Sequence, residues 1–88
     1  MDDSLSLFKA LSDGTRLKIV KFLLNGEKCV CEIIPHVGRA QPTVSLQLAK
    51  LERLGILGSR REGKKMLYRI KGRNVHKVFR ALGGSRHD

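Results

Sequence analysis

The chain has 88 residues, with 18 Lys or Arg against 8 Asp or Glu, a formal net charge of +10 at pH 7 and a pI of about 10.3. This length predicts a single domain over residues 1–88, too small for a deep enzyme cleft. The basic balance favours a polyanionic partner, although Lys and Arg can also simply solvate a surface. We expect a cytoplasmic protein, because no apolar run approaches about 18 residues and residues 1–4 are acidic, unlike a signal peptide.

Two short amphipathic helices are predicted first. Apolar side chains recur at helical spacing in residues 4–11. A second helix is expected over residues 15–24, with Ser12-Asp13 as its N-cap and Gly26 supplying the left-handed residue beyond its end. The apolar positions of the two helices are Leu5, Phe8, Leu11, Leu17, Ile19, Val20, Leu23 and Leu24.

A third and a fourth helix follow, separated by a tight turn at residues 38–40. The third is predicted over residues 30–37. The fourth is predicted over residues 41–54, because Pro42 suits a first helical turn, where no backbone donor is needed, and Gly55 ends it. Its inward side should carry Val44, Leu48, Leu51 and Leu54.

A basic hairpin and a last helix complete the chain. Residues 66–70 alternate as in a strand, residues 56–57 begin the partner strand, and Glu62-Gly63 forms the turn. Asn74 should cap a last helix, and residues 83–88 should form a frayed tail. The apolar stripe of this helix is Val75, Val78, Phe79 and Leu82.

A helix able to enter the DNA major groove, next to a cationic hairpin, predicts a winged helix-turn-helix: mostly α, with about five helices and a two-stranded wing. Gln47 can pair with an adenine edge, and Thr43 can bind a base or a phosphate. Leu46 suits a thymine methyl group or packing on the wing. The cations should bind mainly phosphates. The candidate DNA-binding residues are Arg39, Gln41, Thr43, Ser45, Leu46, Gln47, Lys50, Arg60, Arg61, Lys64 and Lys65.

Four segments together resemble the ArsR/SmtB family of winged-helix repressors that respond to metals or metalloids. They are LSDGTRLKI at 11–19, EKCVCEI at 27–33, QPTVS at 41–45 and RREG at 60–63. The resemblance implies a symmetric homodimer on a palindromic operator, released when an inducer binds. It also implies that the first and last helices form the dimer, although both could instead cap one core. The interface residues would be Leu5, Phe8, Val75, Val78, Phe79 and Leu82.

The pair Cys29 and Cys31 lies where the thiolate site of this family begins, so both are candidate ligands of a thiophilic inducer. Residues two apart on a regular helix point about 200° apart, so shared ligation should require the start of the third helix to unwind or shift, which could re-aim the fourth helix. Glu32 or His36 could add a third donor. The candidate ions are As(III), Sb(III), Cu(I), Cd(II) and Zn(II), none of them needed for folding, with Cu(I) best suited to two thiolates.

Other interpretations stay open. The two thiols could oxidise reversibly or simply be buried apolar groups. His76 and His87, with Asn74 in place of an acid, weakly echo a second metal site of the family. A constitutive architectural or RNA-binding protein would use the charge without the thiols. An enzyme is not expected, because the sequence has no Gly-rich phosphate loop and no HExxH motif.

Overall fold

The computed structural model describes residues 9–72 and 75–77. Residues 9–11 are helical, as predicted for the end of the first helix, and residues 75–77 are helical, as predicted for the start of the last helix. The remainder of those two helices and the predicted tail at 83–88 lie outside the described residues. No helix in the described part of the chain is long and apolar enough to cross a membrane.

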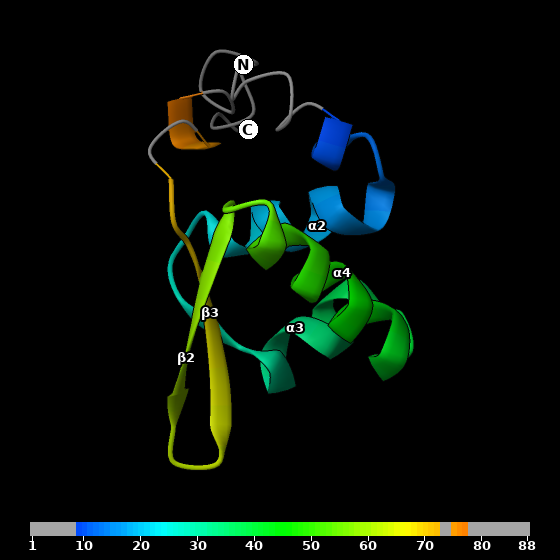
Figure 1. The fold of residues 1–88 in the computed structure, drawn as a ribbon. Helices are drawn as coiled ribbons and strands as arrows, with labels where there is room; N and C mark the ends of the chain where they lie inside the picture. The colour runs from blue at the N-terminus through cyan, green and yellow to red at the C-terminus, as the bar shows by residue number, and fades with distance from the viewer. Residues whose placement is uncertain (1–8, 73–74, 78–88) are drawn as a thin grey trace.

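Three helices and a small sheet lie between these ends (Figure 1). The helices are α2 (Gly14–Leu23), α3 (Val30–Val37) and α4 (Gln41–Arg53), and the strands are β1 (Lys28–Cys29), β2 (Leu57–Glu62) and β3 (Lys65–Ile70). The sheet is antiparallel in the order β1-β3-β2. The expected two-stranded wing is therefore extended by a third strand. β1 has only two residues, which is too short to show an alternating pattern in the sequence.

Local signals set the helix boundaries close to the predicted ones. The Asp13 side chain accepts hydrogen bonds from the backbone N–H groups of Thr15 and Arg16, so it is the N-cap of α2. Gly38 ends α3 with a φ of 76°, a conformation that glycine adopts without strain. Pro42 lies in the first turn of α4, as expected.

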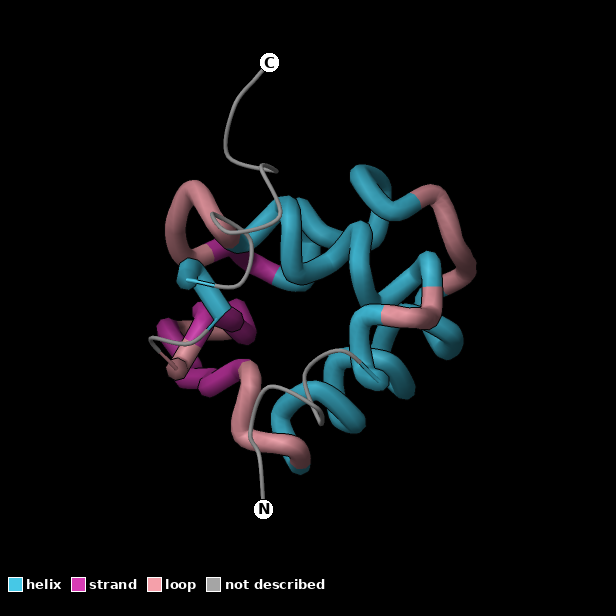
Figure 2. Tube along the Cα trace, turned by 90° about the horizontal axis from the view of Figure 1, so that it is seen from above, coloured by secondary structure: helices cyan, strands magenta, loops and turns pink. Residues whose placement is uncertain are grey.

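The core lies between the three helices and the sheet, with the strands along one side of the helical body (Figure 2). Helices α2, α3 and α4 and the first residue of β2 supply its largest fully buried side chains, which are Ile19, Val20, Leu23, Ile33, Val44, Leu48, Leu51 and Leu57. The prediction that Leu54 belongs to the core is wrong, because this residue is 52% exposed. It follows the last residue of α4, and Gly55, with a φ of 79°, turns the chain there, so Leu54 leaves the inward stripe.

Candidate nucleic-acid interface and cysteine pair

The predicted DNA-binding surface of α4 faces away from the core. Val44, Leu48 and Leu51 are buried, whereas the side opposite to them is exposed. Its exposed predicted DNA-binding residues are Gln41, Thr43, Ser45, Leu46 and Lys50. Leu46 is 55% exposed, so much of its side chain is accessible to a ligand, and its two expected roles, contact with a thymine methyl group and packing on the wing, stay predictions.

Gln47 differs from the other predicted contacts because α2 already holds it. Arg16 donates from Nη1 to Gln47 Oε1 at 2.8 Å and from Nε to the backbone oxygen of Ala10 at 2.8 Å. Gln47 is half-buried and its acceptor is occupied. Pairing with adenine uses both the oxygen and the amide nitrogen of glutamine, and the oxygen has a second lone pair, so the bond to Arg16 restricts the orientation in which that pairing can occur. Sequence reasoning missed Arg16, because no local pattern links residues 31 positions apart.

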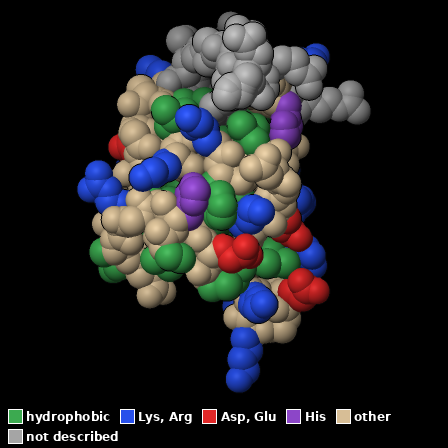
Figure 3. Space-filling view, turned by 180° about the vertical axis from the view of Figure 1, so that it is seen from behind, with side chains coloured by type: hydrophobic (Ala, Val, Ile, Leu, Met, Phe, Trp, Pro, Cys, Tyr) green, Lys and Arg blue, Asp and Glu red, His purple; other side chains and the backbone are tan. Residues whose placement is uncertain are grey.

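The wing is the hairpin of β2 and β3, which turns through Gly63 and Lys64. Figure 3 shows Lys and Arg side chains projecting at its free end. Arg61, Lys64 and Lys65 are exposed, and none of them forms an ion pair within the described part of the chain. These three side chains are therefore free to reach a polyanion.

Arg60, in contrast, is held by an acidic side chain. It donates from Nε and Nη2 to the two carboxylate oxygens of Glu27 at 2.9 and 2.8 Å, and Glu62 lies 3.7 Å from its Nη2. The hydrogen bonds from Arg60 lower the pKa of Glu27, and the same bonds raise the pKa of Arg60. The expected phosphate contact of Arg60 therefore competes with an internal bidentate pair.

A cationic hollow, separate from the wing, lies between α2 and the turn before α4. It has a volume of about 310 Å³, and Gly14 and Thr15 line it together with the cations Lys18, Lys21 and Arg39. Arg39 was predicted to bind phosphate; Lys18 and Lys21 were not. The sequence could place Lys18 and Lys21 only on the side of α2 away from its buried residues. That position is equally typical of lysines that are simply solvated.

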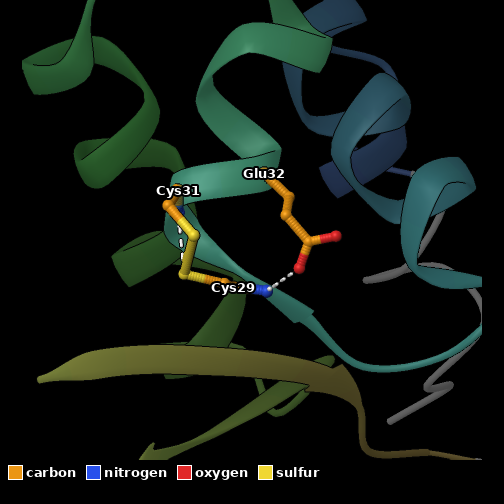
Figure 4. The surroundings of a disulfide bond; sticks show 3 residues. All are labelled: Cys29, Cys31 and Glu32. Carbon is orange, nitrogen blue, oxygen red and sulfur yellow. Dashed lines mark hydrogen bonds between the residues drawn. A yellow bond between two sulfur atoms is a disulfide. The ribbon is translucent and has the colours of Figure 1, made fainter. Parts of the chain in front are cut away.

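A disulfide joins Cys29 and Cys31 (Figure 4). Their Cα atoms are 5.1 Å apart. Cys29 is the N-cap of α3, with extended φ and ψ of −74° and 148°, so it lies outside the helix. The expectation that the helix must unwind or shift before both sulfurs can act together is therefore wrong, because the 200° separation applies only when both residues are helical.

The start of α3 forms a capping box around this pair. The backbone N–H of Cys31 donates to Cys29 Sγ at 3.0 Å, and the backbone N–H of Cys29 donates to Glu32 Oε2 at 3.1 Å (Figure 4). The other expected third donor, His36, stacks on Phe22 with ring centroids 3.9 Å apart. In the residues described, no three His, Cys, Asp or Glu side chains are grouped to hold a metal ion. Neither Glu32 nor His36 is thus placed as a third ligand.

An open groove connects the cysteine pair to α4 and the wing. Its volume is about 550 Å³. The lining residues that matter below are Cys29 and Cys31 from the start of α3, Ser45 from α4, and Lys64, Lys65 and Tyr68 from the hairpin. Burial raises the pKa of Tyr68, so its hydroxyl stays protonated at neutral pH.

The remaining predicted sites fall mostly beyond these residues. His76 is exposed, and Asn74 and His87 lie outside the described part of the chain. Val75 is 3% exposed within a single chain and belongs to its core, and its expected place in a dimer interface stays a prediction. The other expected interface residues, Leu5, Phe8, Val78, Phe79 and Leu82, also lie outside the described residues.

Comparison with known proteins agrees with this arrangement. The family model described as "Bacterial regulatory protein, arsR family" matches residues 13–59. A "Probable mercury resistance operon repressor" of Streptomyces lividans is 42% identical over 69 residues, which cover 78% of this chain and 55% of that protein. The "Arsenical resistance operon repressor" of Escherichia coli (strain K12) is 43% identical over 67 residues, which cover 75% of this chain and 57% of that protein. The chain thus spans little more than half the length of these two relatives.

A solved structure shows the same fold. The solution structure of the "homodimeric winged helix-turn-helix DNA-binding domain" of a possible ArsR-family regulator from Mycobacterium bovis superposes with a TM-score of 0.81 at 31% identity. The match covers 99% of this chain and 89% of that chain. The chain therefore has a winged helix-turn-helix fold and belongs to the ArsR family of bacterial transcriptional regulators, which are DNA-binding proteins and not enzymes.

Proposed function

We propose that this protein is a sequence-specific DNA-binding repressor that acts as a homodimer on a palindromic operator. The observation that carries the proposal is the exposed polar face of α4 next to a wing whose Lys64 and Lys65 have no ion-pair partner in the described residues. The α4 face supplies contacts to base edges, and the wing and the hollow at Arg39 supply contacts to phosphates. Two-fold symmetry would place two α4 helices about one DNA turn apart.

Release from DNA is assigned to Cys29 and Cys31, through binding of a thiophilic ion. The pair lies at the start of α3, the helix that leads into α4, with Cys29 as its N-cap and Cys31 in its first turn, and both residues line the groove that reaches α4 and the wing. The two relatives whose names refer to mercury and arsenical resistance support an inducer of this kind. With only two sulfurs placed together, an ion that accepts two-coordinate thiolate ligation suits the site best, for example Cu(I).

Thiol oxidation is a second candidate for the signal, and the Cys29–Cys31 disulfide favours it. Closing and opening this bond would change the start of α3 without any metal. Reversal separates the two signals: a chelator restores DNA binding after an ion, whereas only a reductant restores it after oxidation.

The experiment uses the reduced, metal-free full chain and an operator selected from random duplexes. Binding of the operator and of a scrambled duplex is measured by fluorescence anisotropy with Cu(I), As(III), Sb(III), Cd(II) or Zn(II). We expect at least one ion to weaken operator binding about 10- to 100-fold, and by linkage to bind the free protein more tightly by the same factor.

Cysteine variants provide the control. Cys29→Ser keeps an oxygen acceptor at the N-cap of α3, so the fold should survive. The ion should no longer release this variant from DNA. Cys31→Ser should behave alike, and His76→Asn should respond as the wild type does. Release that persists in the double Cys→Ser variant would exclude both thiol signals. Equal affinity for all duplexes would instead indicate a constitutive architectural protein.

A further inference from the structure

The charged residues that line the groove beside the cysteine pair are all basic. Cys29 and Cys31 line one cavity of about 550 Å³ together with Lys64 and Lys65, and none of its lining residues is acidic. This volume lies in the range of about 300–1,000 Å³ that is usual for small-molecule sites. A ligand that reacts with sulfur and carries a negative charge would satisfy both features at once.

The two sulfurs differ in access. Cys29 is 4% exposed, whereas Cys31 is exposed. An incoming group from solvent therefore reaches Cys31 first. Cys29 Sγ accepts the backbone N–H of Cys31 at 3.0 Å at the start of α3, so a donor is already in place beside the sulfur that departs when the disulfide opens. The geometry thus makes Cys31 the site of attack and Cys29 the leaving group.

We propose that the groove binds a small thiol that carries a carboxylate, and that this thiol forms a mixed disulfide with Cys31. The thiolate of the ligand attacks Cys31 Sγ, the Cys29–Cys31 bond breaks, and Cys29 leaves as a thiolate that takes a proton from water. One disulfide is replaced by another, so no oxidant is consumed. In the reverse step the Cys29 thiolate attacks Cys31 Sγ and expels the ligand.

The lysines select the ligand by charge. Lys64 and Lys65 line the same groove as Cys31, so a carboxylate on a ligand bound to Cys31 would be attracted there, whereas an ammonium group would be repelled. The same two lysines are proposed DNA contacts, so an occupied groove would also oppose DNA binding. For that effect alone, the inference rests on the proposed function.

The experiment measures the groove chemistry without DNA. In full-length Cys29→Ser, Cys31 is the single thiol of the chain. It is treated at low ionic strength with the symmetric disulfides of 3-mercaptopropionate, 2-mercaptoethanol and cysteamine, which are similar in size but anionic, neutral and cationic. Mixed-disulfide formation is followed by intact-protein mass spectrometry. We expect the anionic reagent to react about 3- to 10-fold faster than the neutral one, since each exposed charge pair adds only a few-fold, and the cationic reagent to react slowest.

Two double variants in the Cys29→Ser background decide whether the groove or the net charge causes this order. Lys64→Gln with Lys65→Gln should remove the preference for the anionic reagent. Lys21→Gln with Lys71→Gln removes the same charge from positions that do not line the groove and should keep the preference. An equal loss in both double variants, or no preference at all, would overturn the proposal. A Cys31→Ser protein whose Cys29 reacts as fast as Cys31 would overturn the order of attack.

Discussion

Single side chains at the proposed DNA-binding surface differ in how free they are. Thr43 and Leu46 are exposed on α4, whereas Gln47 is tied to Arg16 of α2. With one bond from Arg16 already on its oxygen, Gln47 offers its amide N–H groups most freely, so we expect it to donate to a base acceptor. Arg16 is then a positioning residue, because it fixes the orientation of this amide.

Gln47→Glu tests this role. A carboxylate keeps the bond to Arg16 but has no N–H group to donate, so we expect operator affinity to fall by about 1–3 kcal/mol with little change for random DNA. Fluorescence anisotropy on both duplexes measures the difference. If both affinities fall equally, Gln47 contacts no base, and its predicted role in specificity is wrong.

Asp13 predicts a pH dependence of folding. The N–H groups of Arg16 and Thr15 that donate to its carboxylate lower the pKa of Asp13 below its ordinary value of 3.8. The stabilising contribution is therefore complete above that ordinary pKa and is lost as pH falls through the lower folded pKa. Asp13→Asn keeps a neutral cap, so wild type should be more stable than this variant near neutral pH and lose that advantage in acid. Thermal unfolding across pH measures it; a constant difference would contradict the charge effect.

At the scale of an element, the wing combines fixed and free cations. The pair of Arg60 with Glu27 ties β2 to the loop before β1, and strand β3 is paired on both edges. Lys64 and Lys65 lie at the hairpin turn, without an ion-pair partner among the described residues. The base of the wing is thus held to the body while its tip keeps its charge for a ligand.

Salt dependence of DNA binding distinguishes the two kinds of cation. Replacing Lys64 and Lys65 by Ala should flatten the plot of log affinity against log salt by about 0.9 unit for each phosphate that the protein no longer neutralises, equally for all sequences. Replacing Arg60 and Glu27 together by Gln keeps the net charge and should change the slope little. A comparable flattening in that variant would mean that Arg60 leaves Glu27 to bind a phosphate.

At the scale of the whole molecule, the described chain forms its own core from α2, α3, α4 and the sheet, and Val75 belongs to that core. Val75 in the helical residues 75–77 therefore contributes to the fold of one chain. The sequence predicts that Val78, Phe79 and Leu82, the other apolar positions of the expected last helix, contact a partner chain.

Phe79→Asp is expected to separate the proposed dimer into monomers, because an unpaired charge in an apolar interface is strongly unfavourable. A monomer binds only one half of the operator, so operator affinity should weaken about 100-fold or more. Lys77→Asp introduces the same side chain at an exposed position nearby and should leave the dimer intact. Sedimentation velocity at micromolar concentration measures both, and a monomeric wild type would contradict the proposal.

The sequence alone determined the local features of this protein. Helix bounds followed from Asp13, Gly38, Pro42 and Gly55, because caps and turns depend on the conformational preferences of single residues. The apolar spacing placed Val44, Leu48 and Leu51 in the core, and the motifs of the winged helix gave the family. All of these depend on residues a few positions apart.

Tertiary structure decided which side chains are free and which are occupied. The bonds of Arg16 to Gln47 and of Arg60 to Glu27 join residues 31 and 33 positions apart, and no periodic pattern encodes such pairs. The backbone at Cys29 decided that the two sulfurs meet, because an extended N-cap turns its side chain toward the first turn of the helix that it caps. The groove between the cysteines and the wing exists only because β1 and β3 pair and hold the hairpin beside α3.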